Sequence, residues 1–123
     1  YRLVEARCTM VLYGGNHDML LNKIAALNVF DKIYGVSKHK GHWLSHVPFH
    51  SQELRGSKNI HGHLHWQLIV NEDKQPDARY KNVCMEYTGF KPIPWEYVVS
   101  DEYDQECYRK WKYFDSKGLI LPV

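Results

Sequence analysis

The sequence predicts one α/β domain spanning residues 1–123, and three observations support this prediction. Short apolar runs that end at glycine or polar residues recur through most of the chain, which is typical of buried strands and their turns. One long amphipathic pattern near the C-terminus is typical of a helix. A hydrophobic share of 44% and a charged share of 24% suit a chain that buries a single core.

Three segments in the first half have strand-like patterns. Thr9–Tyr13 is an apolar run that meets a glycine pair, so we expect a strand that ends in a tight turn. Lys32–Lys38 alternates partly and Gly41–Ser45 is predicted as a second strand, and we expect the two to form a hairpin through His39-Lys40. Between these strands, Met19–Leu27 has apolar residues at helical spacing and predicts a helix.

The second half continues the mixture of strands and helix. Trp66–Val70 and Tyr80–Tyr87 are predicted strands, with an exposed loop at Asn71–Ala78 between them. Pro94–Ser116 predicts the clearest helix, since proline suits a first helical position and acidic residues follow it. Its apolar stripe, which we expect to pack in the core, consists of Val99, Tyr103, Cys107, Trp111 and Phe114.

Composition narrows the function classes. The net charge is only +2, which disfavours a broad nucleic-acid-binding face. No apolar run is long enough to span a bilayer, so we expect no membrane partner. Cysteines are odd in number and widely spaced, which argues against a disulfide framework and for a reducing, cytoplasmic location.

Histidine is the unusual residue of this chain. All eight histidines lie between His17 and His65, and residues 66–123 contain none. A single histidine is usually a solvated or hydrogen-bonded side chain. A cluster is different, because imidazole is the commonest metal ligand and a base near neutral pH.

The histidines concentrate in three segments, GGNHD at 14–18, SHVP at 45–48 and HGHLH at 61–65. Each segment follows a predicted strand, and strand ends are where loops converge on a site in α/β proteins. Each one taken alone could be an ordinary turn or a solvated loop. Their order and their strand contexts favour a joint functional site.

The chemistry of the segments suits a metal. Asn16 offers a neutral amide oxygen, His17 a proton donor, and Asp18 a carboxylate that could orient a neighbour. His63 and His65 are two residues apart, and on an extended backbone their side chains would point to one side. We therefore expect them to serve one metal or two adjacent metals.

Together the three segments resemble the calcineurin-like metallophosphoesterase superfamily, in its small bacterial and phage form. That family carries G-N-H-[DE], then a lone histidine, then G-H-x-H, which stand here at 15–18, His46 and 62–65. The stretch 79–95 is also similar to small members. The resemblance implies an α-β-β-α sandwich with mixed sheets, whose N-terminal strands are missing from this chain.

The resemblance also implies the roles of the site residues. The implied ligands of two divalent ions (Mn, Fe, Zn or Ni) are Asn16, His46 and His63 for one ion and His65 for the other. His17 matches the histidine that contacts phosphate and protonates the leaving group, and Asp18 matches its support. The implied activity is hydrolysis of a phosphate mono- or diester in a small molecule, nucleotide or nucleic acid. The other four histidines have no matching role.

The chain departs from the family in one large respect. The family's D-x-H and G-D segments, which supply the remaining ligands, have no counterpart before Thr9. We expect the chain to be a C-terminal fragment, a protein whose site another chain completes, or a degenerate relative. Weak or no hydrolysis is expected from the chain alone.

Two rival functions remain open. A non-catalytic phosphoesterase-fold binding module would keep the packing but bind no metal. An independent nucleic-acid-binding domain is suggested by a pI of about 8.4 and 14% aromatic residues. It is disfavoured because the basic residues are scattered rather than arranged in a stripe.

Overall fold

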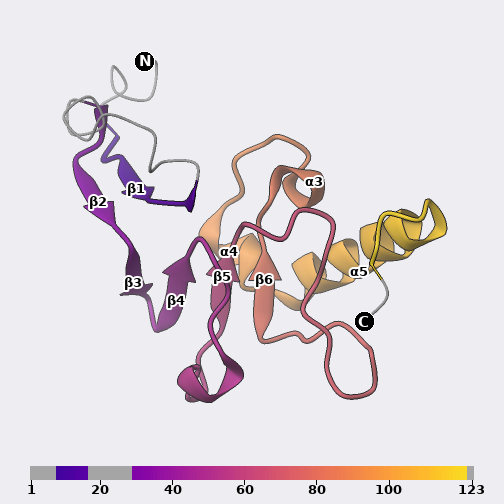
Figure 1. Cartoon of the computed structure of the whole chain (residues 1–123). Helices are drawn as coiled ribbons and strands as arrows, with labels where there is room; N and C mark the ends of the chain where they lie inside the picture. Colours follow the sequence, from indigo (N-terminus) through magenta and orange to yellow (C-terminus); the bar gives the residue numbers. More distant parts are fainter. Residues whose placement is uncertain (1–7, 17–28, 122–123) are drawn as a thin grey trace.

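The computed structural model describes residues 8–16 and 29–121, which form two β-sheets and a set of helices (Figure 1). The first sheet pairs β1 (Val11–Tyr13) with β2 (Lys32–Tyr34) in parallel. The second has the order β3 (Val36–His39), β4 (His42–Ser45), β5 (Asn59–His61) and β6 (Tyr80–Asn82). Its first pair is antiparallel and its other two pairs are parallel, so the predicted α/β class with mixed sheets is confirmed.

One short helix lies between β4 and β5, and the other three helices of the described residues follow β6 in the chain. They are η2 (Ser51–Glu53), α3 (Met85–Thr88), α4 (Trp95–Val98) and α5 (Asp101–Ser116). The α5 helix begins where the Ser100 hydroxyl accepts a hydrogen bond from the Tyr103 backbone N–H. It ends just before Gly118, whose φ of 74° takes the chain out of the helical conformation. Within the described residues, none of these helices is long and apolar enough to cross a membrane.

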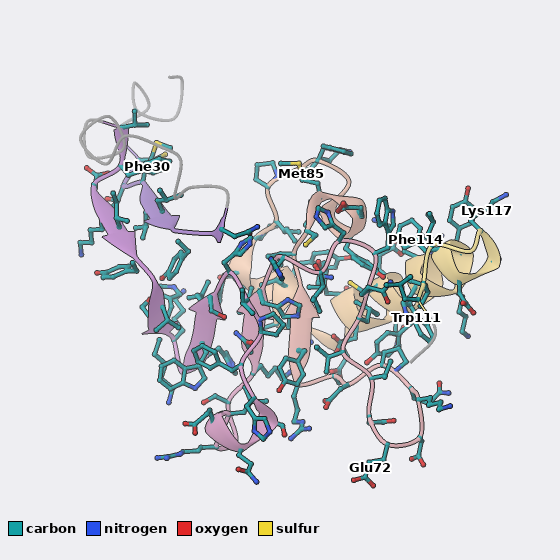
Figure 2. All side chains as sticks on the ribbon, viewed as in Figure 1. Phe30, Glu72, Met85, Trp111, Phe114 and Lys117 are labelled. Atoms are coloured by element: carbon teal, nitrogen blue, oxygen red, sulfur yellow. The ribbon has the colours of Figure 1, made fainter. Side chains whose placement is uncertain are left out.

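The core lies between the four-stranded sheet and the helices α3, α4 and α5. Its buried members are Ile60, Tyr87, Val98, Tyr103 and Cys107. The stripe predicted for the long helix packs here, since its remaining members are partly buried against this cluster. Figure 2 shows two of them, Trp111 and Phe114, on the part of α5 that extends beyond the sheet.

A buried ion pair joins the sheet to α5. Lys81 lies on β6 beside Ile60 and is almost fully buried. Its ammonium group donates a 2.6 Å hydrogen bond to Asp104 Oδ1 and a 3.3 Å hydrogen bond to the Ser100 carbonyl. The ion pair therefore links the edge strand of the sheet to the first turn of α5.

Several predicted boundaries are wrong by a few residues. The predicted strand Lys32–Lys38 is two strands, which belong to different sheets. The hairpin between β3 and β4 is confirmed, but its turn residues are Lys40 and Gly41 rather than His39-Lys40. Both turn residues have positive φ, which matches the twist of a two-residue hairpin. The predicted helix at Met19–Leu27 lies outside the described residues.

Three longer predictions are overturned by side-chain hydrogen bonds. Trp66–Val70 is a loop, and only Val70 makes an isolated bridge. Tyr80–Tyr87 is a strand only as far as Asn82, whose Oδ1 accepts the Cys84 backbone N–H and turns the chain into α3. Pro94–Ser116 is two helices, α4 and α5, because Ser100 caps a new helix start. In each case a polar side chain takes a backbone group that the predicted element would have used.

Candidate functional site

Three loops meet at the carboxyl edge of the parallel strands. Asn16 follows β1, His46 follows β4, and His63 and His65 follow β5. They line one pocket of about 570 Å³, whose other walls are Gly62, Val83, Cys84, Met85, Glu86 and Phe90. The sequence predicted that these strand ends would converge, and the structure brings all four predicted metal ligands to this pocket.

Two potential metal-ligand atoms lie close to His46 Nε2, and all three residues line the pocket. His46 Nε2 lies 2.8 Å from Asn16 Oδ1 and 3.2 Å from His63 Nδ1. Ligand atoms about 2.1 Å from a common ion, at tetrahedral or octahedral angles, are roughly 3.0–3.4 Å apart. The two observed separations, each measured to His46 Nε2, are close to that range.

Hydrogen bonding alone does not explain this arrangement. The Nε2 atom of a neutral histidine carries either one hydrogen or one lone pair. If it donates to Asn16 Oδ1, it has no lone pair to accept from His63. If it accepts a hydrogen bond from His63, no hydrogen lies between Nε2 and the amide oxygen of Asn16, and their lone pairs repel each other. Both contacts therefore cannot be full hydrogen bonds at the same time.

Gly15 permits the close approach of His46 to the loop after β1. A Cβ atom at Gly15 would lie 2.8–2.9 Å from three atoms of the His46 ring, closer than real Cβ contacts. Any side chain here would therefore push the imidazole away from Asn16. The glycine in the GNHD segment thus has a steric role that the structure makes visible.

The backbone of the HGHLH segment is not extended, so that part of the prediction is wrong. His63 and His65 have φ values of 69° and 55°, in the left-handed region that non-glycine residues rarely occupy. Their side chains consequently contact different residues. His63 lies against His46, and His65 pairs with Glu86. The left-handed conformation costs a non-glycine residue on the order of 1–3 kcal/mol, and residues in it cluster at functional sites. Two of them in one segment therefore favour a functional role for it.

Asn82 holds this strained segment in place. The side chain is almost fully buried, and its amide donates to the carbonyls of His65 and Gln67 at 3.1 and 2.8 Å. Tyr87 donates a further hydrogen bond to the carbonyl between them. These bonds replace strand pairing and determine the conformation of the loop that carries His65.

Glu86, like Asn82, has a role in the site that the sequence analysis did not predict. Its Oε1 lies 2.8 Å from His65 Nδ1, and the His65 side chain is 63% exposed against 20% for Glu86. A carboxylate on Nδ1 holds the hydrogen there and leaves Nε2 with its lone pair, as in many metal-binding histidines. The available signal was polarity, because Asn82 and Glu86 are polar residues inside a predicted strand.

His61 lies beneath the pocket rather than in it. Its ring packs edge-on against Tyr80, and its Nδ1 lies 2.9 Å from the Gly62 carbonyl. Burial, together with nearby His46 and His63, lowers the pKa of His61 from 6.5 to about 4, although the hydrogen bond to Gly62 opposes the shift. His61 is therefore a neutral framework residue at physiological pH.

The other histidines lie away from the pocket. The His42 ring accepts a hydrogen bond from the Lys58 backbone N–H, and His50 caps η2 by accepting from Gln52. His39 packs edge-on against Trp95. The predicted catalytic pair His17 and Asp18 lies outside the described residues.

A larger pocket, of about 630 Å³, lies at another edge of the sheet. It is formed between Phe49, the loop around Asn71, and Tyr80. Its oppositely charged residues Asp77 and Arg79 already pair with each other at 2.7 Å. Its lining includes one histidine, His50, whereas three histidines line the other pocket.

Within the part of the chain that the structure describes, no three His, Cys, Asp or Glu side chains are grouped closely enough to hold a metal. His46 contacts one histidine, His63, and the amide of Asn16, while the carboxylate of Glu86 contacts His65. Comparison of the chain with family models, curated proteins and solved structures finds no match.

Proposed function

We propose that this chain contributes ligands to the metal centre of a phosphoesterase that resembles the calcineurin-like type. The observation that carries the proposal is the shared contact at His46 Nε2, which lies within 2.8–3.2 Å of both Asn16 Oδ1 and His63 Nδ1. An amide oxygen and two imidazole nitrogens suit a divalent ion of the manganese, iron, zinc or nickel group. The order of the three segments along the chain supplies the link to phosphoester chemistry.

Each pocket residue has a proposed task. Asn16, His46 and His63 hold one ion, and His65 presents Nε2 to a second ion while Glu86 fixes its ring. Divalent ions in such centres offset phosphate charge and lower the pKa of a bound water to about 7. His17 is the proposed general acid for the leaving oxygen, and Asp18 its support.

The rest of the proposed site comes from elsewhere. A centre with two ions needs further carboxylate ligands, which we propose are supplied by another segment or another chain. We propose that the two-stranded sheet of β1 and β2 belongs to the second sheet of an α-β-β-α sandwich. The substrate is a phosphate mono- or diester carried by a small molecule, nucleotide or nucleic acid.

Calorimetric titration of the full 123-residue chain with zinc or manganese tests the proposal. We expect one ion to bind, and His63→Ala to weaken it at least about 10-fold, since even residues behind the ligands change affinity that much. His39→Ala is the matched control, because it removes an exposed histidine from β3 that lies outside the pocket. Inorganic phosphate should bind only to the metal-loaded protein.

Two results would overturn the proposal. One is metal binding that falls equally in both variants, which would place the ion elsewhere. The other is the absence of any metal binding, which would favour the non-catalytic binding module. Robust hydrolysis of bis(p-nitrophenyl) phosphate by this chain alone would support the phosphoesterase but contradict the need for further ligands.

A further inference from the structure

We propose that an apolar shelf beside the histidine pocket receives a flat aromatic group from the phosphoester substrate. The shelf consists of Val83, Met85 and Phe90. The placement of the substrate's phosphate at the histidines rests on the proposed function. Such a shelf would favour aryl and nucleoside phosphates over aliphatic phosphates as substrates.

The shelf is continuous with the proposed metal site. Its three residues line the 570 Å³ pocket together with the histidines. The same three residues also line a neighbouring pocket of about 400 Å³, whose outer wall includes Lys91 and Ile93. Ligand pockets usually occupy 300–1,000 Å³, so the pair of hollows has room for a phosphate at one end and a ring system at the other.

Val83 packs against the core, but the other two members of the shelf are exposed and lie outside it. Phe90 is 79% exposed and Met85 is 60% exposed, although both are large apolar side chains. Figure 2 shows Met85 above the carboxyl ends of the strands, on the side where α3 lies. The buried core forms without either residue.

Phe90 is also held in a costly conformation. Its φ is 63°, directly after Gly89 at 69°, so two successive residues are left-handed at the end of α3. Glycine takes this conformation freely, but a bulky residue pays about 1–3 kcal/mol for it. An exposed ring with no core contact to offset this cost is best explained by a contact made with a ligand.

The chemistry of the shelf suits a planar partner. An exposed phenyl ring offers a π face for stacking, and a thioether such as Met85 makes favourable contacts with aromatic rings. Base stacking on an aromatic side chain contributes roughly 1–3 kcal/mol. A ring stacked on Phe90 while its phosphate reaches the histidines would occupy both hollows of the pocket at once.

Two binding measurements test the shelf separately from the metal site. Saturation-transfer NMR with adenosine, which has no phosphate, probes the metal-free chain. Calorimetry of the zinc-loaded chain then compares adenosine monophosphate and phenyl phosphate with methyl phosphate. Phe90→Ala is the test variant, and Phe90→Leu keeps apolar bulk without a π face. Tyr113→Ala is the control, since it removes an aromatic ring that is 58% exposed on α5.

We expect adenosine to bind the wild-type chain and Tyr113→Ala, and to bind Phe90→Ala about 10-fold more weakly or not at all. Both aromatic phosphates should bind more tightly than methyl phosphate, with Phe90→Leu losing most of the difference. A preference for adenosine monophosphate alone would narrow the class to nucleotides.

Equal binding of phenyl and methyl phosphates, with no adenosine signal, would overturn the shelf while leaving the metal site intact. Adenosine binding without any metal-dependent phosphate binding would overturn the proposed function and leave the shelf standing. Light scattering adds one further outcome. A dimer in the wild type that dissociates in Phe90→Ala would show that a second copy covers the shelf, which would also overturn the inference.

Discussion

Removing Asp104 should destabilise the fold far more than removing an exposed acidic residue of the same helix. The Lys81 side chain is fully buried and the Asp104 side chain is 10% exposed, and their charged atoms lie 2.6 Å apart. In Asp104→Ala, the buried ammonium would keep only the 3.3 Å hydrogen bond to the Ser100 carbonyl. The hydrogen bond that links β6 to α5 would be lost with the charge.

The expected loss of stability follows from the burial of Lys81. Breaking a buried ion pair by removing one partner typically costs about 3–5 kcal/mol, because it leaves an uncompensated charge. A single domain has about 5–15 kcal/mol of stability in total, so this loss is a large share. With a urea dependence of about 2 kcal/mol per molar, the unfolding midpoint should fall by about 2 M.

Urea unfolding followed by tryptophan fluorescence measures the effect, since the chain contains four tryptophans. Glu106→Ala is the control, because Glu106 pairs with an exposed arginine on α5 and such pairs contribute little. The double change Lys81→Met with Asp104→Leu should recover most of the stability by replacing the pair with apolar contacts. If Asp104→Ala shifts the midpoint no more than Glu106→Ala does, the argument from burial is wrong.

Three further predictions concern the site. Gly15→Ala should weaken zinc binding in calorimetry with little change in thermal stability, because the new methyl group would displace the His46 ring; unchanged zinc affinity would contradict this steric role. Acid should destabilise the fold, because the pKa of His61 is lowered to about 4 in the folded state and returns to 6.5 on unfolding. The unfolded chain then binds the extra proton, so stability present above pH 6.5 is lost as the pH falls towards 4, by about 2 kcal/mol between pH 7.5 and pH 5. Urea midpoints across that range should show this slope in the wild type and lose it in His61→Gln. Finally, Asn82→Ala removes two hydrogen bonds to the histidine loop and should cost about 1–3 kcal/mol. Faster amide hydrogen exchange at residues 63–67 would confirm its role, and unchanged protection there would refute it.

Much of the fold class and the donor set could be predicted from local pattern. A glycine pair after an apolar run marked the end of β1, and two neighbouring strand-like patterns marked the β3–β4 hairpin, although its turn lies one residue later than predicted. Imidazoles and an amide at strand ends indicated which side chains would meet. These features depend on near neighbours in the chain, so the sequence displays them directly.

The errors arose where a distant side chain replaced a local pattern. Trp66–Val70 looks like a strand, yet the carbonyls of residues 65–67 accept hydrogen bonds from Asn82 and Tyr87, which lie 15–21 residues further along. The supporting roles of Asn82 and Glu86 were missed for the same reason. Their contacts with the loop depend on the pairing of β6 with β5, which positions Asn82, and on the place of α3, which carries Glu86.

The sequence by itself determined which chemical groups the loops carry and where most of the strands end, because residue type and periodicity are properties of neighbouring residues. Tertiary structure decided how those groups face one another. The left-handed backbone at His63 and His65, the shared contact at His46 Nε2 and the pairing of His65 with Glu86 all require segments that lie far apart in the chain. Such geometry is stabilised only when the packed fold compensates for local strain, and a linear pattern contains no record of that balance.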